Sequence, residues 1–299
     1  MDIQNYCKKI VISALCFAVL VGDVWGDVLG LRPYVLSSNV QADRVKTLIE
    51  VKQALEKAGF ELVGEYAPDE ARHVVVVTSA YLKQLAKKDI GALFAVPLRI
   101  SFTHVQGKLQ VAYTNPQFIQ HAYHVKGDLS VVSEQLRSVL GVQALFGSVG
   151  LSESQLLRYK YSYGMESFHD YLEIKRFRTH NLALQRIRQV LDKPSAVLGK
   201  VFEITIPGTA TTLFGVSIKQ GKGGDRTLSD AVDTGLLKHT PRLPYTVVVK
   251  KGRVFTLHPR FKLPLDFPDL KRTGDYSFTR IIQAPGAIET ALRTIVEAP

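Results

Sequence analysis

The chain has 299 residues, of which 46% are hydrophobic and 22% charged, so its composition excludes a disordered polypeptide and favours one large or two small globular domains. Both cysteines, Cys7 and Cys16, lie in the first 26 residues, so a chain cleaved after them would have no thiol for a disulfide, a metal site or a nucleophile. The net charge of +11 either serves solubility alone or favours anionic partners, and for an exported protein those are a small anion or an envelope component rather than nucleic acid.

The N-terminus has the pattern of an export signal. Lys8 and Lys9 precede an apolar stretch at 10–22, which is shorter than the roughly 20 residues needed to span a bilayer. Small residues at 24 and 26 suit cleavage before Asp27. We therefore predict a signal peptide at 1–26, a periplasmic or secreted product, and no transmembrane segment after cleavage, with an uncleaved anchor as the alternative.

In the rest of the chain, the same order of predicted strands and helices occurs twice. In the first copy, apolar periodicity and the turn residues predict strands and helices in a fixed order. The predicted elements are a strand at 33–38, a helix at 43–57, strands at 60–66 and 74–77, a helix at 81–88, a hairpin of 97–102 with 108–113, and a helix at 129–140.

The second copy repeats that order about 137 residues later. Its predicted elements are a strand at 170–174, a helix at 180–193, strands at 197–204 and 213–216, a helix at 228–237, a hairpin of 244–249 with 253–257, and a helix at 287–297. The sequence thus predicts an α+β fold of two tandem sheet-plus-helices units, at 30–145 and 165–299. We expect the units to pack about a pseudo-two-fold axis, with the cleft between them as the first place for a ligand.

A connector at 146–164 is predicted between the two copies. It contains the basic, tyrosine-rich segment Arg158–Tyr163. This segment is either a strand that joins the copies or an exposed contact for a protein partner. In the second case the protein would be an envelope scaffold or interaction module.

The first copy resembles the small bacterial α+β family known as domain of unknown function 302. The resemblance depends on Tyr34, on the helix end at 54–60, on 96–100 and above all on 108–118, where a hairpin strand ends in a tyrosine and a polar residue followed by proline. The second copy has the same layout but is more diverged. The residues at 78–80 depart from the family's usual glycine-asparagine-proline turn. The resemblance implies an open sheet covered by helices, and it implies no reaction.

One candidate ligand site lies where each hairpin leads into a helix. Asn115, followed by a proline, can cap the next helix, and this structural role is sufficient by itself. The same helix N-terminus could also hold an anion beside Tyr113 and Arg99. His258 and Arg260 stand at the matching place in the second copy.

A second candidate site is the pair His121 and His124. Two histidines three apart on a helix share a face and could hold a metal ion or haem iron, with His104 one strand back, although a pair of surface histidines is the simpler interpretation. The chain contains no Gly-x-Ser-x-Gly, His-Glu-x-x-His, Gly-x-Gly-x-x-Gly or Cys-x-x-Cys-His motif. We therefore favour a non-enzymatic binding or accessory protein for a small or anionic ligand, with a metal- or haem-associated protein and a scaffold as the alternatives.

Overall fold

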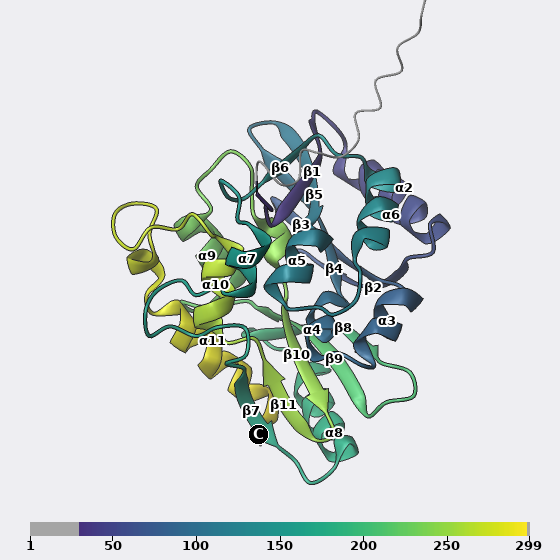
Figure 1. The fold of residues 1–299 in the computed structure, drawn as a ribbon, viewed down its shortest axis with the longest axis vertical. Coiled ribbons are helices and arrows are strands. Elements are labelled where there is room, and N and C mark those ends of the chain that lie inside the picture. Colours follow the sequence, from purple (N-terminus) through teal and green to yellow (C-terminus); the bar gives the residue numbers. More distant parts are fainter. Residues whose placement is uncertain (1–29, 298–299) are drawn as a thin grey trace, which may run out of the picture.

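The computed structural model describes residues 30–297, so the predicted signal peptide at 1–26 lies outside the described residues. Within this range eleven strands form one sheet in which every paired neighbour is antiparallel, and helices pack around it (Figure 1). The predicted α+β fold class is confirmed. The strands are β1 Tyr34–Val40, β2 Glu61–Tyr66, β3 Arg72–Thr78, β4 Leu98–Val105, β5 Lys108–Thr114, β6 Ala144–Phe146, β7 Leu172–Arg176, β8 Leu198–Thr205, β9 Thr211–Ile218, β10 Tyr245–Lys250 and β11 Arg253–Thr256.

The strand order divides the sheet into two similar halves. It reads β6-β1-β5-β4-β3-β2 and then β8-β9-β10-β11-β7. From the middle of the sheet outward, the first half has β2, β3, β4, β5 and β1, and the second half has β8, β9, β10, β11 and β7. In both halves the strand that comes first in the sequence therefore lies outside the other four, and the short strand β6 is added at the edge of the first half. The halves meet where β2 pairs with β8 through Gly64 and Phe202.

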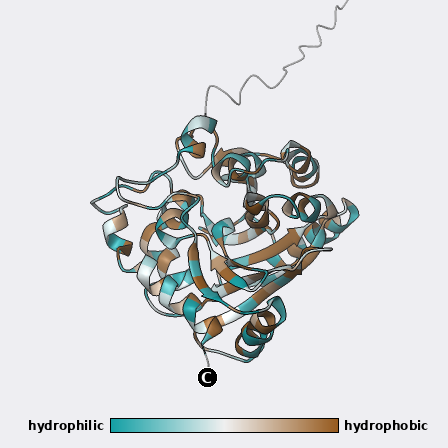
Figure 2. Ribbon diagram, turned by 60° about the horizontal axis from the view of Figure 1, so that its bottom comes forward, coloured by the Kyte–Doolittle hydropathy of each residue, from teal (hydrophilic) through white to brown (hydrophobic). Residues whose placement is uncertain are grey.

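The helices surround the strand layer, and their brown apolar faces turn toward the strands in Figure 2. The helices of the first half and the connector are α2 Arg44–Lys57, α3 Ala80–Ala86, α4 Ile90–Ala95, α5 Pro116–Ala122, α6 Ser130–Leu140 and α7 Glu153–Leu157. Those of the second half are α8 His180–Leu191, α9 Asp225–Val232, α10 Pro259–Asp266 and α11 Ala284–Arg293, with 3-10 turns η1 Thr240–Arg242, η2 Phe278–Ile281 and η3 Thr294–Val296. Among the described residues, no helix is both long and apolar enough to cross a membrane.

Both predicted hairpins form, and the same backbone device closes each of them. Gln106 and Gly107 take φ of 49° and 76° between β4 and β5, and Lys251 and Gly252 take φ of 51° and 83° between β10 and β11. Two successive residues with positive φ make a tight turn whose twist matches that of the flanking strands. Glycine at the second position therefore fixes the register of each hairpin.

Two helices were predicted with the wrong bounds. The helix expected at 228–237 is α9, Asp225–Val232, and the helix expected at 287–297 is α11 followed by η3. Each begins three residues before its predicted start. Of the two alternatives for Arg158–Tyr163, the strand does not form, and after α7 the segment follows an irregular path.

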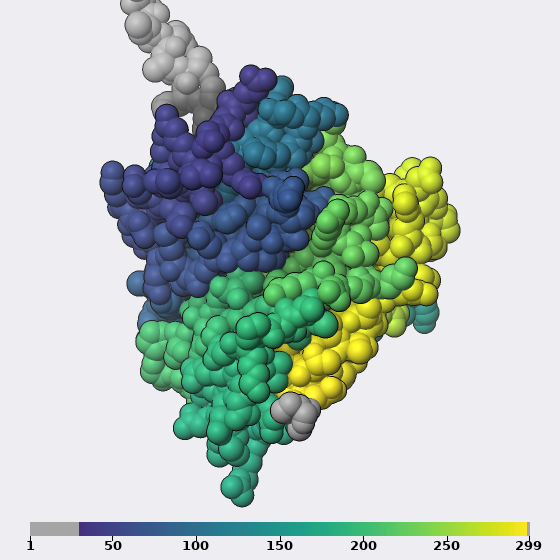
Figure 3. Space-filling model, turned by 180° about the vertical axis from the view of Figure 1, so that it is seen from behind, coloured from purple at the N-terminus to yellow at the C-terminus, as the bar shows by residue number. Residues whose placement is uncertain are grey.

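Segments of one half pack on the strands of the other. The turn η1 lies over β4, where Thr103 and Thr240 share a hydrogen bond of 2.9 Å. In the other direction, the ring of Phe94 in α4 lies 6.2 Å from Phe255 of β11 and stacks 5.9 Å from Tyr171. Seen from behind in Figure 3, the purple and blue first half meets the green and yellow second half along one boundary. The halves thus share a buried interior.

Candidate functional site

The starts of β4 and β10 meet in this shared interior, and Arg99 joins them. Its Nη2 donates to the carbonyl of Pro244 at 3.2 Å and to Oγ1 of Thr246 at 2.7 Å, while Nη1 donates to the carbonyl of Pro97 at 2.9 Å. Arg99 is only 4% exposed. A residue predicted for ligand binding therefore lies between the halves.

The charge on Arg99 has no direct counterion among residues 30–297. All its hydrogen-bond partners are neutral, no carboxylate lies within ion-pair distance, and its Nε has no partner. Burial lowers the pKa of this guanidinium, although arginine stays protonated at neutral pH. A buried charge is costly unless it is paired, so the charge of Arg99 is unfavourable in this interior, and Arg242, which is also buried, has an unpartnered Nε too.

Two small cavities adjoin Arg99. They have volumes of about 10 and 20 Å³, and each is lined by Arg99, Tyr123 and Lys262. A space of this size holds about one water molecule. The charged residues that line them are Arg99, Arg242, Lys262 and Asp266, three cations against one carboxylate. The cavities therefore carry an excess of positive charge.

Lys262 and Asp266 form the one direct ion pair of the cavity walls. They lie four residues apart on α10, both are nearly buried, and the ammonium donates to Oδ1 of Asp266. Burial lowers the pKa of Lys262 to about 8, so the side chain stays largely protonated at neutral pH. Asp266 is thus committed to Lys262 rather than to Arg99.

Tyrosines complete the walls. The hydroxyl of Tyr34 donates to the carbonyl of Asp266 at 3.0 Å, whereas the buried hydroxyl of Tyr245 has no partner. Oδ2 of Asp266 also lacks one. Burial raises the pKa of Tyr123 and Tyr245, so both remain neutral hydrogen-bond donors. An occupant of the cavities would meet donors from Arg99 and Tyr245.

The other predicted ligand residues of the first half do not line these cavities. Asn115 caps α5 by accepting from the N–H of Gln117 at 3.1 Å, and its Nδ2 donates to the carbonyl of Arg32 at 2.8 Å. Tyr113 donates to the carbonyl of Gly141 at 3.1 Å, and burial raises its pKa to about 12. Both side chains are engaged within the fold.

The predicted residues of the second half gather around Glu166 instead. His258 caps α10 through Nδ1, which accepts from the N–H of Arg260 at 3.2 Å. Nε2 of His258 lies 3.7 Å from Oε1 of Glu166, and Nε of Arg260 lies 3.1 Å from its Oε2. Glu166, at the start of the second unit, thus forms an ion pair with Arg260 and lies beside His258.

The two histidines predicted for a metal do not share a helix face. The helix α5 ends at Ala122, and His124 has a φ of 51° after it. Nε2 of His121 lies 3.5 Å from Glu153, while the ring of His124 lies 4.7 Å from His169. Burial lowers the pKa of His124. Among residues 30–297, no group of three His, Cys, Asp or Glu side chains is placed to hold a metal ion.

Two of the three tyrosines of the connector donate hydrogen bonds to the second half, and the third is exposed. The hydroxyl of Tyr159 donates to the carbonyl of Pro264 at 2.9 Å, and that of Tyr161 to the carbonyl of Lys271 at 2.7 Å. Tyr163 is fully exposed. Tyr159 and Tyr161 therefore anchor the segment against α10 and the residues after it.

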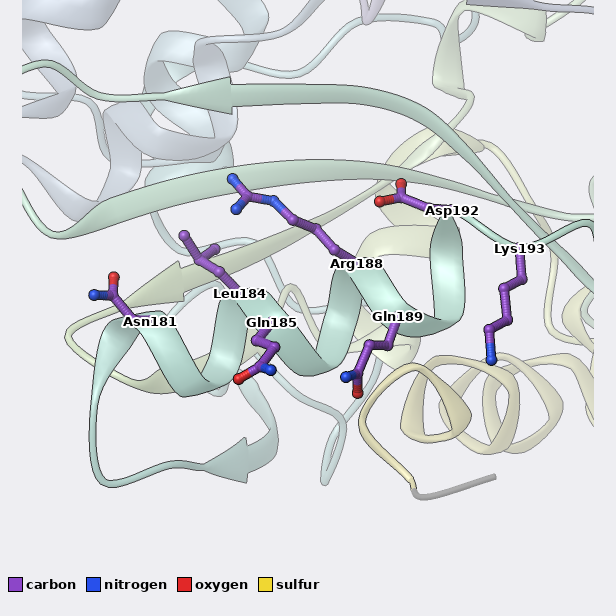
Figure 4. A pocket seen from close by; sticks show the side chains of 7 residues that line it. All are labelled: Asn181, Leu184, Gln185, Arg188, Gln189, Asp192 and Lys193. Atoms are coloured by element: carbon purple, nitrogen blue, oxygen red, sulfur yellow. The ribbon is translucent and has the colours of Figure 1, made fainter.

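A larger depression of about 490 Å³ lies over α8 (Figure 4). All seven side chains that line it project from this one helix and the turn after it. Two of them are already paired, Arg188 with Glu203 and Asp192 with Lys200. The surface offers no converging polar groups of the kind that ligand sites require.

Inspection of the sequence missed Lys262, Arg242 and the tyrosines of the central cavities. One signal was available, because Lys262 and Asp266 stand at the i,i+4 spacing of a helical ion pair within an otherwise apolar run. Nothing in the sequence, however, places Arg242 or Tyr245 beside Arg99. Only the packing of one half against the other brings them together.

Comparison with known proteins leaves the family open. No protein-family model and no curated protein matches the chain. One similar solved structure is an uncharacterized conserved protein of domain of unknown function 302 from Bacillus stearothermophilus, with 9% identity and a TM-score of 0.32. The match covers 36% of this chain and 94% of that one. Membership of the family stays a prediction from the sequence.

Proposed function

We propose that this chain is a binding protein whose ligand is a small anion held in the buried cavities between the two halves. The observation that carries the proposal is Arg99, a buried cation that has an unpartnered Nε and, in the described part of the chain, no carboxylate within ion-pair distance. An anion in the adjoining cavity would supply the missing countercharge.

The cavity walls favour a compact anion. The larger cavity measures about 20 Å³, room for one water-sized occupant, and Lys262 and Arg242 add two more cations to its walls. A monoatomic anion such as chloride is little larger than water, whereas phosphate and sulfate need more space. Chloride is therefore the first ligand to test.

Thermal unfolding tests this function. Replacing gluconate by chloride at constant ionic strength is expected to raise the Tm of the wild-type protein by about 2 °C or more, because a ligand that binds only the folded state stabilises it. The variant Arg99→Met keeps the length of the side chain and removes its charge, and it should show no chloride-dependent shift. The matched control Arg137→Met, at an exposed position on α6, should respond like wild type.

A crystal soaked in bromide locates the anion independently of stability. An anomalous peak between Arg99 and Lys262 is the expected result. Water alone in the cavities, together with equal Tm shifts in wild type and Arg99→Met, would refute the proposal. An Arg99-dependent shift with sulfate but not chloride would retain an anion site and reject the monoatomic ligand.

We further propose that residues 30–145 and 165–299 are diverged copies of one unit related by a pseudo-two-fold axis. The matching strand order of the two halves supports this. So does the contact of Arg99 with Thr246, since both residues stand two places after the proline that opens their hairpin. An experimental structure in which the two backbones fail to superpose element by element would contradict it.

We also propose that the protein acts outside the cytoplasm, in the periplasm or after secretion. Lys8, Lys9 and the apolar stretch at 10–22 support a cleaved signal. The expected mass of the purified product corresponds to a chain that begins at Asp27. An intact mass that includes residues 1–26 would reject cleavage.

A further inference from the structure

We call the junction where β2 pairs with β8 the seam between the halves. A second pocket opens beside this seam. It has a volume of about 400 Å³, within the usual range of small-molecule sites. Its walls come from the end of β2, from β8 and β9, and from the start of α9. Both halves therefore contribute to it, and none of its residues lines the central cavities.

The carboxyl group of Asp225 lies in the wall of this pocket and is 3% exposed. Its Oδ2 accepts from the hydroxyl of Tyr66 at 3.0 Å and from the N–H of Ile218 at 3.2 Å. Its Oδ1 is buried and has no partner. A buried carboxyl oxygen without a donor is costly, so a ligand group that donates a hydrogen bond would be favourable here.

The rim of the pocket is basic, and one of its cations is free of acidic partners. Lys200 pairs with Asp192, and Arg226 pairs with Asp230. Nζ of Lys219 donates to the carbonyl of Ser195 at 2.9 Å, and no carboxylate within residues 30–297 lies at ion-pair distance from it. An anionic group of a ligand would therefore find Lys219 available.

A glycine in β8 leaves room for the side chains of Ser217 and Lys219 at the rim of the pocket. A Cβ on Gly199 would lie 2.7 Å from Oγ of Ser217 and 3.0 Å from Cε of Lys219. Any larger residue at this position of β8 would displace the lysine. The small residue thus permits the observed position of Lys219 at the rim.

From these contacts we infer that the seam pocket binds a small hydroxylated anion, such as a polyol phosphate or a hydroxycarboxylate, with a ligand hydroxyl donating to Asp225 and the anionic group beside Lys219. This site is separate from the anion cavity around Arg99. The two ligands differ in size, since the seam pocket admits an organic molecule and the central cavities admit about one atom.

Isothermal titration calorimetry with glycerol 3-phosphate tests the inference. Wild-type protein should bind this probe more tightly than it binds inorganic phosphate, and glycerol should bind weakly, because each fragment keeps only one of the two contacts. At pH 8.5, where the carboxyl is ionised, Asp225→Asn preserves the shape of the side chain and removes its charge, and it should weaken binding about tenfold. Lys219→Gln should weaken it about fivefold, with a reduced dependence on salt.

Two controls separate this site from the rest of the molecule. Lys222→Gln makes the same charge change in the exposed loop before α9 and should bind the probe like wild type. Arg99→Met should also bind it like wild type, so failure of the central anion site and failure of this one are distinguishable. Absence of binding by wild type, or equal affinity in wild type, Asp225→Asn and Lys219→Gln, would overturn the inference.

Discussion

Burial moves the pKa of some side chains in this protein far from the ordinary value for their residue type. Asp225 is the clearest case, because burial raises the pKa of its carboxyl to about 7 even though Arg242 lies close to it and lowers the value. Lys262 shows the opposite direction, with a pKa lowered by burial to about 8. Both side chains therefore change charge much nearer to neutral pH than exposed residues of their type do.

The raised pKa of Asp225 predicts an inverted pH dependence of stability. Because the folded-state pKa exceeds the ordinary unfolded value of about 3.9, the folded protein binds more protons between about pH 4 and pH 7. The contribution of Asp225 to the free energy of unfolding therefore falls as pH rises through this window and is constant above it.

Urea unfolding at pH 4.5, 6 and 7.5 measures this effect. The free energy of unfolding of wild type minus that of Asp225→Asn should decrease by roughly 3 kcal/mol across the series, because the asparagine does not titrate. A difference that is the same at all three pH values would show that the carboxyl titrates normally.

At the scale of elements, short-range sequence signals such as helix caps were sufficient to locate most helices and strands. Asp43, Ser79 and Asn115 cap the helices that the sequence places after them, because a side-chain acceptor there satisfies N–H groups that the helix leaves free. Two helices without such a cap, α9 and α11, were located less well. The helix α9 begins after Gly224 with no side-chain cap, and its predicted start was three residues late.

At the scale of the whole molecule, the seam between the halves is the feature on which both proposed sites depend. Gly64 of β2 faces β8 so closely that an added Cβ would lie 2.0 Å from the carbonyl oxygen of Val201. Gly286 in α11 has ordinary φ and no atom within 4 Å of the corresponding position. Replacement by alanine can therefore be compared at a crowded glycine, Gly64, and at an open one, Gly286.

Gly64→Ala is expected to lower the free energy of unfolding by about 2 kcal/mol or more, because backbone must move apart along the seam. Gly286→Ala should leave it unchanged or raise it by up to about 1 kcal/mol, because alanine favours the helix and reduces the entropy of the unfolded chain. Urea unfolding of both variants makes the comparison. Equal effects of the two substitutions would contradict a close-packed seam.

By itself, the sequence determined the α+β class, the order of the elements and the two hairpins, because periodicity, caps and paired turn residues act over a few neighbouring positions. It also singled out Arg99. The tertiary structure alone decided that Arg99 lies beside Thr246, Lys262 and Tyr245, and that Asp225 of the second half receives the hydroxyl of Tyr66 from the first. These contacts join residues more than 140 positions apart, and no local pattern encodes them, since they arise only when one half packs against the other.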